Sequence, residues 1–386
     1  MNLTQDLGKR FMYLHRTEDV LHQLTVWLLS DRVLQPVRSG AGVANWLWPD
    51  GIHDGLYPEI CGYYLQFLAL AASSRDNFNS QNFNEMPVAV LKDAALRVVE
   101  WLDEIAPTGE PLTLYHRDPT QSDWRNKCLF AFDLGMIYRG FDAVERQWPS
   151  IVPDELMRRY RTSLSSITWN GRLLSHRLRS DVSDAKVPVK WSTQIDVHHV
   201  KIAAAIAGTG PQMADAVWTT IADQAQALAR EGSARMRELH PFLYSVEGWL
   251  MLWGQAGVPV FLDHADTAFQ IVLTEFNSCN GTLPPIAGRT DLASRADVLA
   301  QALRAGLILE QAGRLDVTSN SSWSLTRDKL KQELLSRVTP EGGIEFDRIG
   351  QHRNVWASLF AWQALHFLIQ SGNGSLDARE AAASLI

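Results

Sequence analysis

The chain has 386 residues, few cysteines and no long hydrophobic run. Its three cysteines, Cys61, Cys128 and Cys279, lie far apart and form no Cys-x-x-Cys pair. This excludes a disulfide framework and a cysteine-rich zinc site. No run approaches the ~18 apolar residues of a membrane-spanning helix, and residues 1–10 have no apolar signal core. We therefore expect a cytoplasmic protein without a membrane span.

Excess positive charge, linkers and strand patterns are also missing. The formal net charge of −7 excludes a duplex nucleic-acid binder and an anionic-membrane binder. No Pro/Gly/Ser-rich linker divides the chain, so residues 1–386 are expected to form a single domain. Strand signals are nearly absent, which predicts an all-α fold. We find no cofactor motif and expect no cofactor and no metal. The sequence leaves a monomer and a homodimer both open.

One stretch, from His240 to Leu250, sets the plan of the whole chain. At ~100° per residue, His240, Tyr244 and Glu247 fall on one helical stripe. Pro241 suits a first-turn position, so the polar end is the start of the helix. The residues that follow are apolar on most sides, which predicts a buried helix that begins with polar side chains.

The same plan recurs five more times, at a period of about 60 residues. Buried helices are predicted at 58–72, 132–140, 191–206, 240–253, 294–304 and 353–365. Amphipathic helices are predicted at 5–30, 88–105, 154–168, 211–231, 259–276 and 322–337. Six buried helices need an outer ring to cover them. The sequence therefore predicts an (α/α)6 toroid, a closed barrel of six helical hairpins, with a polar loop tip at 74–86.

All six buried helices should begin at the same end of this barrel. The loops that lead into them, at about 38–57, 107–129, 170–195, 232–239, 277–292 and 338–352, are expected to surround one cavity. Helix amino ends that converge there favour anions or developing negative charge.

Several helix starts resemble those of the (α/α)6-toroid superfamily over nearly the whole chain. Tyr57-Pro58-Glu59-Ile60-Cys61-Gly62-Tyr63 resembles the YPE-x-TGY opening of an inner helix in proteins described as prenyltransferase-like or six-hairpin-glycosidase-like. His240–Gly248, Asp297–Arg304 and Asn354–Leu365 resemble later motifs of the same group. The resemblance implies the toroid architecture, and it leaves the activity open because one such scaffold hosts many chemistries.

Three better-defined types within this superfamily can be compared with the chain. Terpene cyclases carry an Asp-x-Asp-Asp motif, which is absent here. Peptide-cyclising zinc enzymes carry a Cys-His-Gly segment, where this chain has Cys279-Asn280-Gly281. The N-acylglucosamine 2-epimerase type carries His-x-x-Glu at an inner-helix start, and here the spacing appears as Tyr244-x-x-Glu247.

The candidate catalytic residues lie at the starts of the buried helices. We expect His240 to transfer a proton, Glu247 to position it or share the task, and Tyr244 to donate a hydrogen bond. Glu59 and Asp133 are further candidates that could supply the two carboxylates of a glycosidase. The alternative is a polar cluster that bonds its own loop, and a first-turn carboxylate is also what the helix dipole favours.

Candidate substrate-binding residues surround these positions. Tryptophans beside polar residues are expected to form stacking walls for a sugar ring: Trp46, Trp48, Trp191 and Trp356. Charged residues are expected either to bind a carboxylate or phosphate or to form surface ion pairs: Lys201, Arg289, Asp291 and Arg295. Further contacts are expected from Asp54, Tyr57, Tyr63, Asp297, Gln301 and Asn354. Adjacent helical residues point ~100° apart, so His198 and His199 should not chelate one metal, and one of them, assigned as His198, should face inward.

These patterns favour an enzyme that acts on a saccharide, with or without a negative charge, by acid/base epimerisation or isomerisation. Hydrolysis by Glu59 or Asp133 together with Glu247 is an alternative. Two other classes stay open: a cyclase or transferase for an isoprenoid or peptide-derived substrate, and a non-catalytic saccharide-binding protein. The expected partner is a small molecule or a glycan.

Overall fold

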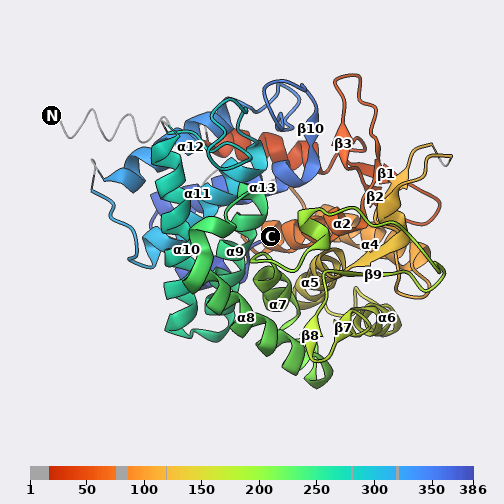
Figure 1. Ribbon diagram of the computed structural model, residues 1–386. Helices are drawn as coiled ribbons and strands as arrows, with labels where there is room; N and C mark the ends of the chain where they lie inside the picture. The colour runs from red at the N-terminus through yellow and green to blue at the C-terminus, as the bar shows by residue number, and fades with distance from the viewer. Residues whose placement is uncertain (1–16, 75–85, 119, 280, 319–320) are drawn as a thin grey trace.

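An inner ring of six helices forms the centre of the molecule. The computed structural model describes residues 17–74, 86–118, 120–279, 281–318 and 321–386. Within these ranges the inner helices are α2 (Pro58–Ser73), α5 (Ala131–Gln147), α7 (His199–Ile206), α9 (Leu239–Ala256), α11 (Ala296–Gln311) and α13 (Val355–Gly372). Each packs on the next, and α13 packs on α2 (Figure 1). The ring is therefore closed.

An outer ring covers the inner one. It consists of a helix over 17–28, α4 (Val88–Ile105), α6 (Asp154–Ser165), α8 (Pro211–Arg235), α10 (Pro259–Ser278) and α12 (Ser322–Leu335). The five labelled outer helices contact α2, α5, α7, α9 and α11 in that order. The helix over 17–28 reaches α13, where Trp362 Nε1 donates to Thr25 Oγ1 at 2.8 Å. The predicted barrel of six helical hairpins is confirmed.

Two sequence predictions about local structure need correction. The third inner helix begins at His199 rather than at Trp191, and Trp191–Thr193 forms a single 3-10 turn, η3. The β-branched Thr193, Ile195 and Val197 disfavour a helix between these points. The start of the predicted helix 5–30 and most of the predicted loop tip 74–86 lie outside the described residues.

Short strands, which the sequence barely signals, tie the loops together. In the described ranges they form five antiparallel pairs: β1 (Leu34–Pro36) with β2 (Ala41–Val43), β3 (Trp46–Leu47) with β10 (Arg353–Asn354), β4 (Gly55–Leu56) with β5 (Tyr115–His116), β6 (Cys128–Phe130) with β9 (His176–Leu178), and β7 (Thr168–Trp169) with β8 (Arg172–Leu173). A 3-10 turn, η2 (Trp124–Lys127), precedes β6. The pairing of β3 with β10 joins the first loop before an inner helix to the last.

The end of the chain enters the ring from the carboxyl ends of the inner helices. The short helix α14 (Ala378–Ala383) packs on α9 and α11, and Figure 1 shows the C-terminus at the centre of the ring. Leu385 and Ile386 are fully buried. No helix in the described ranges has the length and hydropathy needed to cross a bilayer.

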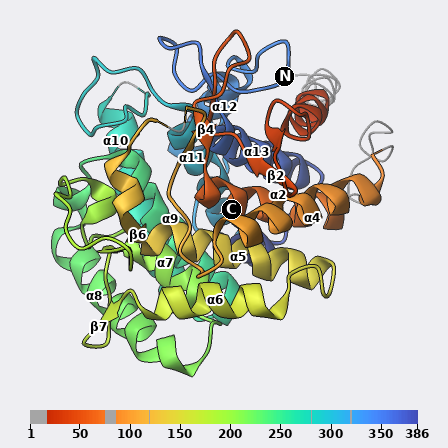
Figure 2. The ribbon, with the colours of Figure 1, turned by 90° about the vertical axis from the view of Figure 1, so that its right-hand side faces the viewer.

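Helices α2 and α5 pack closely along their length and lie side by side in Figure 2. A side chain on Gly62 would overlap with the Met136 carbonyl of α5, and one on Gly140 would overlap with Gly62 itself. These two glycines therefore let the two backbones touch one turn beyond Glu59 and Asp133.

Replacing Gly62 by Ala is expected to destabilise the protein by about 1–3 kcal/mol, because the methyl group must push the two helices apart. The free energy of unfolding in urea measures this. Gly208→Ala is the matched control, since nothing lies within 4 Å of a methyl group there. Equal stabilities for the two variants would contradict the assigned role of Gly62.

Candidate active site

Six residues from the starts of the inner helices form a layer that we call the first-turn ring. They are Glu59 on α2, Asp133 on α5, His198 at the N-cap of α7, His240 on α9, Asp297 on α11 and Trp356 on α13. Glu59, Asp133 and Trp356 are half-buried, so this layer can be reached from outside. The expected common end of the inner helices therefore brings together side chains from all six of them.

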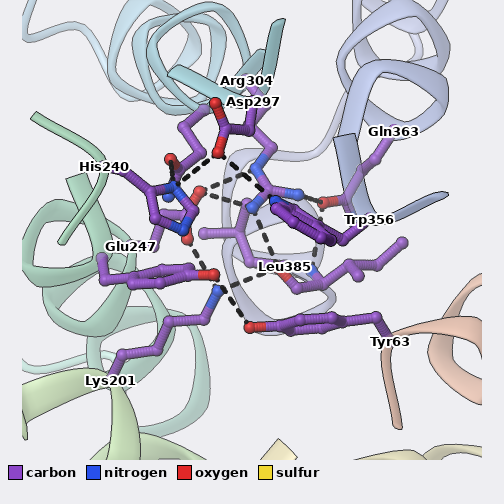
Figure 3. A network of polar contacts seen from close by, with 12 residues as sticks. Tyr63, Lys201, His240, Glu247, Asp297, Arg304, Trp356, Gln363 and Leu385 are labelled. Carbon is purple, nitrogen blue, oxygen red and sulfur yellow. Dashed lines mark hydrogen bonds and ion pairs between the residues drawn. The ribbon is translucent and has the colours of Figure 1, made fainter. Parts of the chain in front are cut away.

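His240 is held by two acceptors at the same nitrogen. Its Nδ1 lies 2.7 Å from Gln301 Oε1 and 3.3 Å from Asp297 Oδ2 (Figure 3). Since both partners accept, we infer that Nδ1 carries the proton. No hydrogen bond from the described residues reaches Nε2, which is left as the basic nitrogen. Burial lowers the pKa of His240 to about 4, against the opposing charge of Asp297, so the ring is neutral at pH 7.

Asp297 is itself fully buried, and both of its carboxylate oxygens accept hydrogen bonds. Both of its oxygens accept from the Arg295 guanidinium, and Trp356 Nε1 donates to Oδ2 at 3.3 Å. Although burial works to raise the pKa of this carboxyl, Arg295 and His240 hold it below its usual value. Asp297 is therefore a charged support for the His240 ring.

Beneath the first-turn ring, two tyrosines meet across the centre. Tyr63 on α2 and Tyr244 on α9 have their hydroxyl oxygens 3.1 Å apart. Lys201 Nζ lies 4.3 Å from the centre of the Tyr244 ring, and Phe360 on α13 packs edge-on against Tyr63 at 5.2 Å. These side chains separate the first-turn ring from a deeper layer of charges.

That deeper layer, which we call the floor, consists of Lys201, Glu247, Arg304 and the main-chain oxygen of Ile386. Glu247 Oε2 accepts from Lys201 Nζ at 2.7 Å, and its Oε1 accepts from Arg304 Nε at 2.8 Å. Both cations also donate to the Ile386 oxygen, at 3.0 and 2.9 Å. All three side chains have zero exposure. Burial lowers the pKa of Lys201 to about 7, against the pull of Glu247.

The contacts within the floor show that the roles predicted for Glu247 and Lys201 are wrong. Glu247 does not position His240, because it lies seven residues along the helix, ~10 Å deeper at 1.5 Å per residue. Asp297 and Gln301 hold the His240 ring instead. Lys201 does not hold an outside anion, because its partners are Glu247 and Ile386.

Glu59 and Asp133 form a carboxyl pair at the starts of α2 and α5. Burial raises the pKa of Glu59 to about 7, although hydrogen bonds from Tyr63 and Tyr57 and the charge of Lys201 oppose this. Burial raises the pKa of Asp133 well above its usual value, and the Glu59 charge adds to the effect. Arg125, the nearest cation on the loop side, is already bound by both oxygens of Asp123.

Aromatic residues pack around the first-turn ring. Trp46 packs edge-on against Trp356 at 4.8 Å, and Trp48, 39% exposed, lies beside His352. Trp48 Nε1 is fixed by Asp54 at 2.8 Å. On the far side, Trp191 lies over His198 at 5.2 Å. The residues predicted to stack on a sugar therefore lie beside the first-turn ring, Trp356 next to Asp297 and Trp191 next to His198.

No family model and no curated protein sequence matches this chain, but solved structures do. Cellobiose 2-epimerase from Spirochaeta thermophila aligns with a TM-score of 0.66 at 13% identity, over 96% of this chain and 99% of that one. A D-mannose isomerase aligns with a TM-score of 0.65 at 11% identity, over 92% and 97%. An unsaturated glucuronyl hydrolase specific for heparin aligns with a TM-score of 0.58 at 13% identity, over 92% and 96%. The chain is an (α/α)6-toroid protein.

At these identities the likeness establishes the toroid fold alone, and the residues must be judged by their contacts. His198 faces the site, since it packs on Trp191 and Phe132, whereas His199 Nδ1 accepts from the Asp196 amide at 3.3 Å. No group of three or more His, Cys, Asp and Glu side chains in the described part of the toroid could hold a metal ion.

Three predicted substrate contacts of the toroid have other partners. Arg289 and Asp291 are exposed and bind each other through two hydrogen bonds of 2.7 Å, as the surface ion-pair alternative anticipated. Asn354 is fully buried, and its Oδ1 caps α13 by accepting from the Ala357 amide at 2.7 Å. Its side-chain oxygen therefore serves the helix rather than a ligand.

Several site residues of the toroid were missed in the sequence. Arg304 shares a helical stripe with Asp297 and Gln301, so the signal for it was present. Phe346 and His352 flank Trp46 at 4.9 and 4.4 Å, yet only the pairing of β3 with β10 brings their loop there. Arg125 and Asp123 likewise have no pattern of their own.

Proposed function

We propose that this toroid is a carbohydrate-active enzyme that epimerises or isomerises a sugar by moving a proton on the carbon next to its carbonyl group. His240 is the base. The observation that carries the proposal is the orientation of this ring: Nδ1 is held by Asp297 and Gln301, and no hydrogen bond from the described residues occupies the neutral Nε2, which can therefore contact a substrate. Sugar epimerases and an isomerase among the structural neighbours support the substrate class at the level of the fold.

The chemistry follows from this arrangement. In the open-chain form of a sugar, the carbonyl group acidifies the neighbouring C–H bond. His240 Nε2 takes that proton, and the electron pair moves toward the carbonyl oxygen to give an enediolate. The amino ends of the inner helices converge on this layer and favour the developing negative charge. Return of a proton to the other face gives an epimer, and return to the neighbouring carbon gives the ketose.

We further propose that the substrate is neutral. The two arginines nearest the first-turn ring are each bound by both oxygens of a carboxylate, Arg295 by Asp297 and Arg125 by Asp123. The cations of the floor are held by Glu247. An anionic sugar would therefore find its counter-charges already engaged, and it would lie beside Glu59 and Asp133. Trp46, Trp48 and Trp356 would stack on the sugar rings.

The toroid is proposed to work as one domain, residues 1–386. All three cysteines are unpaired and buried, which supports the expected cytoplasmic location as part of this proposal. The polar first-turn ring weighs against an isoprenoid substrate, whose pocket should be apolar.

The test is hydrogen exchange at carbon 2. D-mannose, D-glucose and cellobiose are incubated with the protein in deuterium oxide and followed by proton NMR. We expect the carbon-2 proton of at least one sugar to be lost without cleavage of a glycosidic bond. His240→Ala should slow this by about 10²–10⁴-fold, while Arg158→Ala, an exposed change on α6, should leave it unchanged. Exchange that survives in His240→Ala would overturn the assignment.

Glycoside hydrolysis is the second candidate, and one observation favours it. Glu59, with its pKa raised to about 7, is suited to act as a general acid, and Asp133 lies beside it. Glu247 is not available as the partner carboxylate, because Lys201 and Arg304 bind it in the floor. Release of glucose from cellobiose without exchange at carbon 2 would favour hydrolysis over epimerisation.

A further inference from the structure

We propose that Glu59 and Asp133 hold one proton between them and act as the acid that faces His240, so that the enzyme is a two-base epimerase rather than an isomerase. The inference rests on the proposed function, and it assigns the carboxyl pair a task in the same reaction.

The backbone contact at Gly62 sets the separation of the two helices that carry the carboxyls. Gly62 is three residues after Glu59, and Met136, whose carbonyl it touches, is three residues after Asp133. Glu59 and Asp133 therefore each lie one turn before this backbone contact. A cavity of about 10 Å³ beside Asp133 is lined by Asp133, Thr113 and Pro58, room for about one water molecule.

In the described part of the chain, the cations that act on the pair already have carboxylate partners of their own. The titratable groups that face Glu59 or Asp133 are Tyr57, Tyr63, Tyr244, Lys201 and Arg125, with Asp123 behind them. Arg125 is bound by both oxygens of Asp123, and Lys201 is bound by Glu247. Two half-buried carboxyls that repel each other, with no free cation near them among the described residues, cannot both ionise cheaply, so one of them keeps a proton.

The pair and His240 stand on opposite sides of the ring. In the closed order α2, α5, α7, α9, α11, α13, helix α9 is three positions from α2 in either direction. Tyr63 and Tyr244 bridge these two helices with hydroxyl oxygens 3.1 Å apart. Glu59 precedes Tyr63 by one turn and His240 precedes Tyr244 by one turn. The tyrosine pair therefore lies one turn deeper than both groups, and the Glu59 carboxyl and the His240 imidazole face each other above it.

This placement fits proton transfer on both faces of one carbon. His240 Nε2 forms a bond to the proton on one face, the C–H bond breaks, and its electron pair forms the enediolate. The protonated carboxyl then gives its proton to the opposite face of the same carbon, and the carbonyl group re-forms. The products are the epimer, an imidazolium and an ionised pair. Transfer of that proton back to the pair through solvent restores the enzyme, and no other reactant is needed.

The shared proton is tested on the protein alone, from the pH dependence of its melting temperature. A carboxyl whose pKa is raised on folding binds more protons in the folded state, so its contribution to stability falls as the pH rises from about 4.5 to above 7. Buried histidines and Lys201 act in the opposite sense but are common to all variants. Relative to wild type, Glu59→Gln and Asp133→Asn should therefore melt several degrees higher at pH 8 and gain much less at pH 5.

Asp142→Asn is the matched control, because Asp142 lies exposed on the same helix as Asp133. The melting temperature of Asp142→Asn should depend on pH as that of the wild type does. If the melting temperatures of Glu59→Gln and Asp133→Asn also follow the wild-type pH dependence, the proposal that the pair holds one proton is overturned. This result does not depend on the activity toward sugars.

The catalytic assignment is tested by isotope. Glu59→Gln should still exchange the carbon-2 proton of the sugar that wild type accepts, because His240 remains, but it should lose at least tenfold in formation of the epimer. Equal losses of exchange and epimer would overturn the facing-acid role. If the melting curves behave as expected but wild type exchanges no sugar, the shared proton stands, while the proposed function and the catalytic role fail together.

Discussion

Glu247→Gln is expected to cost about 3–5 kcal/mol of unfolding free energy, which is near the upper end of what a single substitution does to stability. The substitution leaves two buried cations, Lys201 and Arg304, without the Glu247 carboxylate that each of them binds in the floor. Removing one partner from a buried ion pair is far more costly than the pair itself is stabilising. Urea unfolding at pH 7 measures the loss.

The matched control is Glu155→Gln, which removes an exposed ion pair with Arg158 and should change stability by less than about 0.5 kcal/mol. The pH dependence gives a second check. Although burial works to raise it, Arg304 and Lys201 hold the pKa of Glu247 below its usual value. The contribution of Glu247 to the free energy of unfolding is therefore present above about pH 4.5, and it is lost as the pH falls through the lower folded-state pKa. A Glu247→Gln protein as stable as wild type would show that the ion pairs of the floor do not stabilise the folded protein.

Asp297→Asn is expected to reduce turnover on the order of 10²–10⁴-fold, the largest effect on activity apart from the loss of His240 itself. Asp297 touches His240 rather than the substrate, so it is a positioning residue. Without its charge the Nδ1 proton is held less firmly, and Arg295 is left unpaired beside the imidazole. The rate of hydrogen exchange at carbon 2 measures this.

A purely structural role for Asp297 would not move the pH profile, whereas a positioning role must. The Asp297 charge raises the pKa of His240 against the lowering effect of burial. In Asp297→Asn the acid limb of the rate profile should therefore shift to lower pH. The double variant Asp297→Asn/Gln301→Glu, which restores a carboxylate next to Nδ1, should recover part of the rate. An unchanged acid limb would leave Asp297 with a structural role only.

The architecture was predictable from the sequence because its signals are local. A buried helix such as α9 is recognisable within one stretch, with Pro241 in the first turn and apolar residues on most sides after it. Six such stretches separated by amphipathic helices leave few ways to bury the apolar faces other than a closed double ring. The position of His240, Glu59, Asp133 and Asp297 in first turns was readable for the same reason.

Which side chains contact one another could not be predicted, because these contacts depend on the order of the helices around the ring. His240 and Glu247 share a stripe on one helix, which suggested the pairing that the structure corrects. The actual partners of His240 come from α11, and those of Glu247 come from α7 and α11. Trp191, expected to open a helix, lies instead in a short 3-10 turn that places it against His198.

The sequence by itself determined that six buried helices begin with polar residues, since a helical period is a property of consecutive residues. Only the tertiary structure decided which of those residues meet. Glu59 lies near enough to Asp133 to raise its pKa because Gly62 and Gly140 let two backbones touch, and Glu59 lies across the ring from His240 because α2 and α9 are opposite members of a ring of six. The physical reason is that long-range contacts arise from the closure of the ring, to which no single helix contributes a recognisable signal.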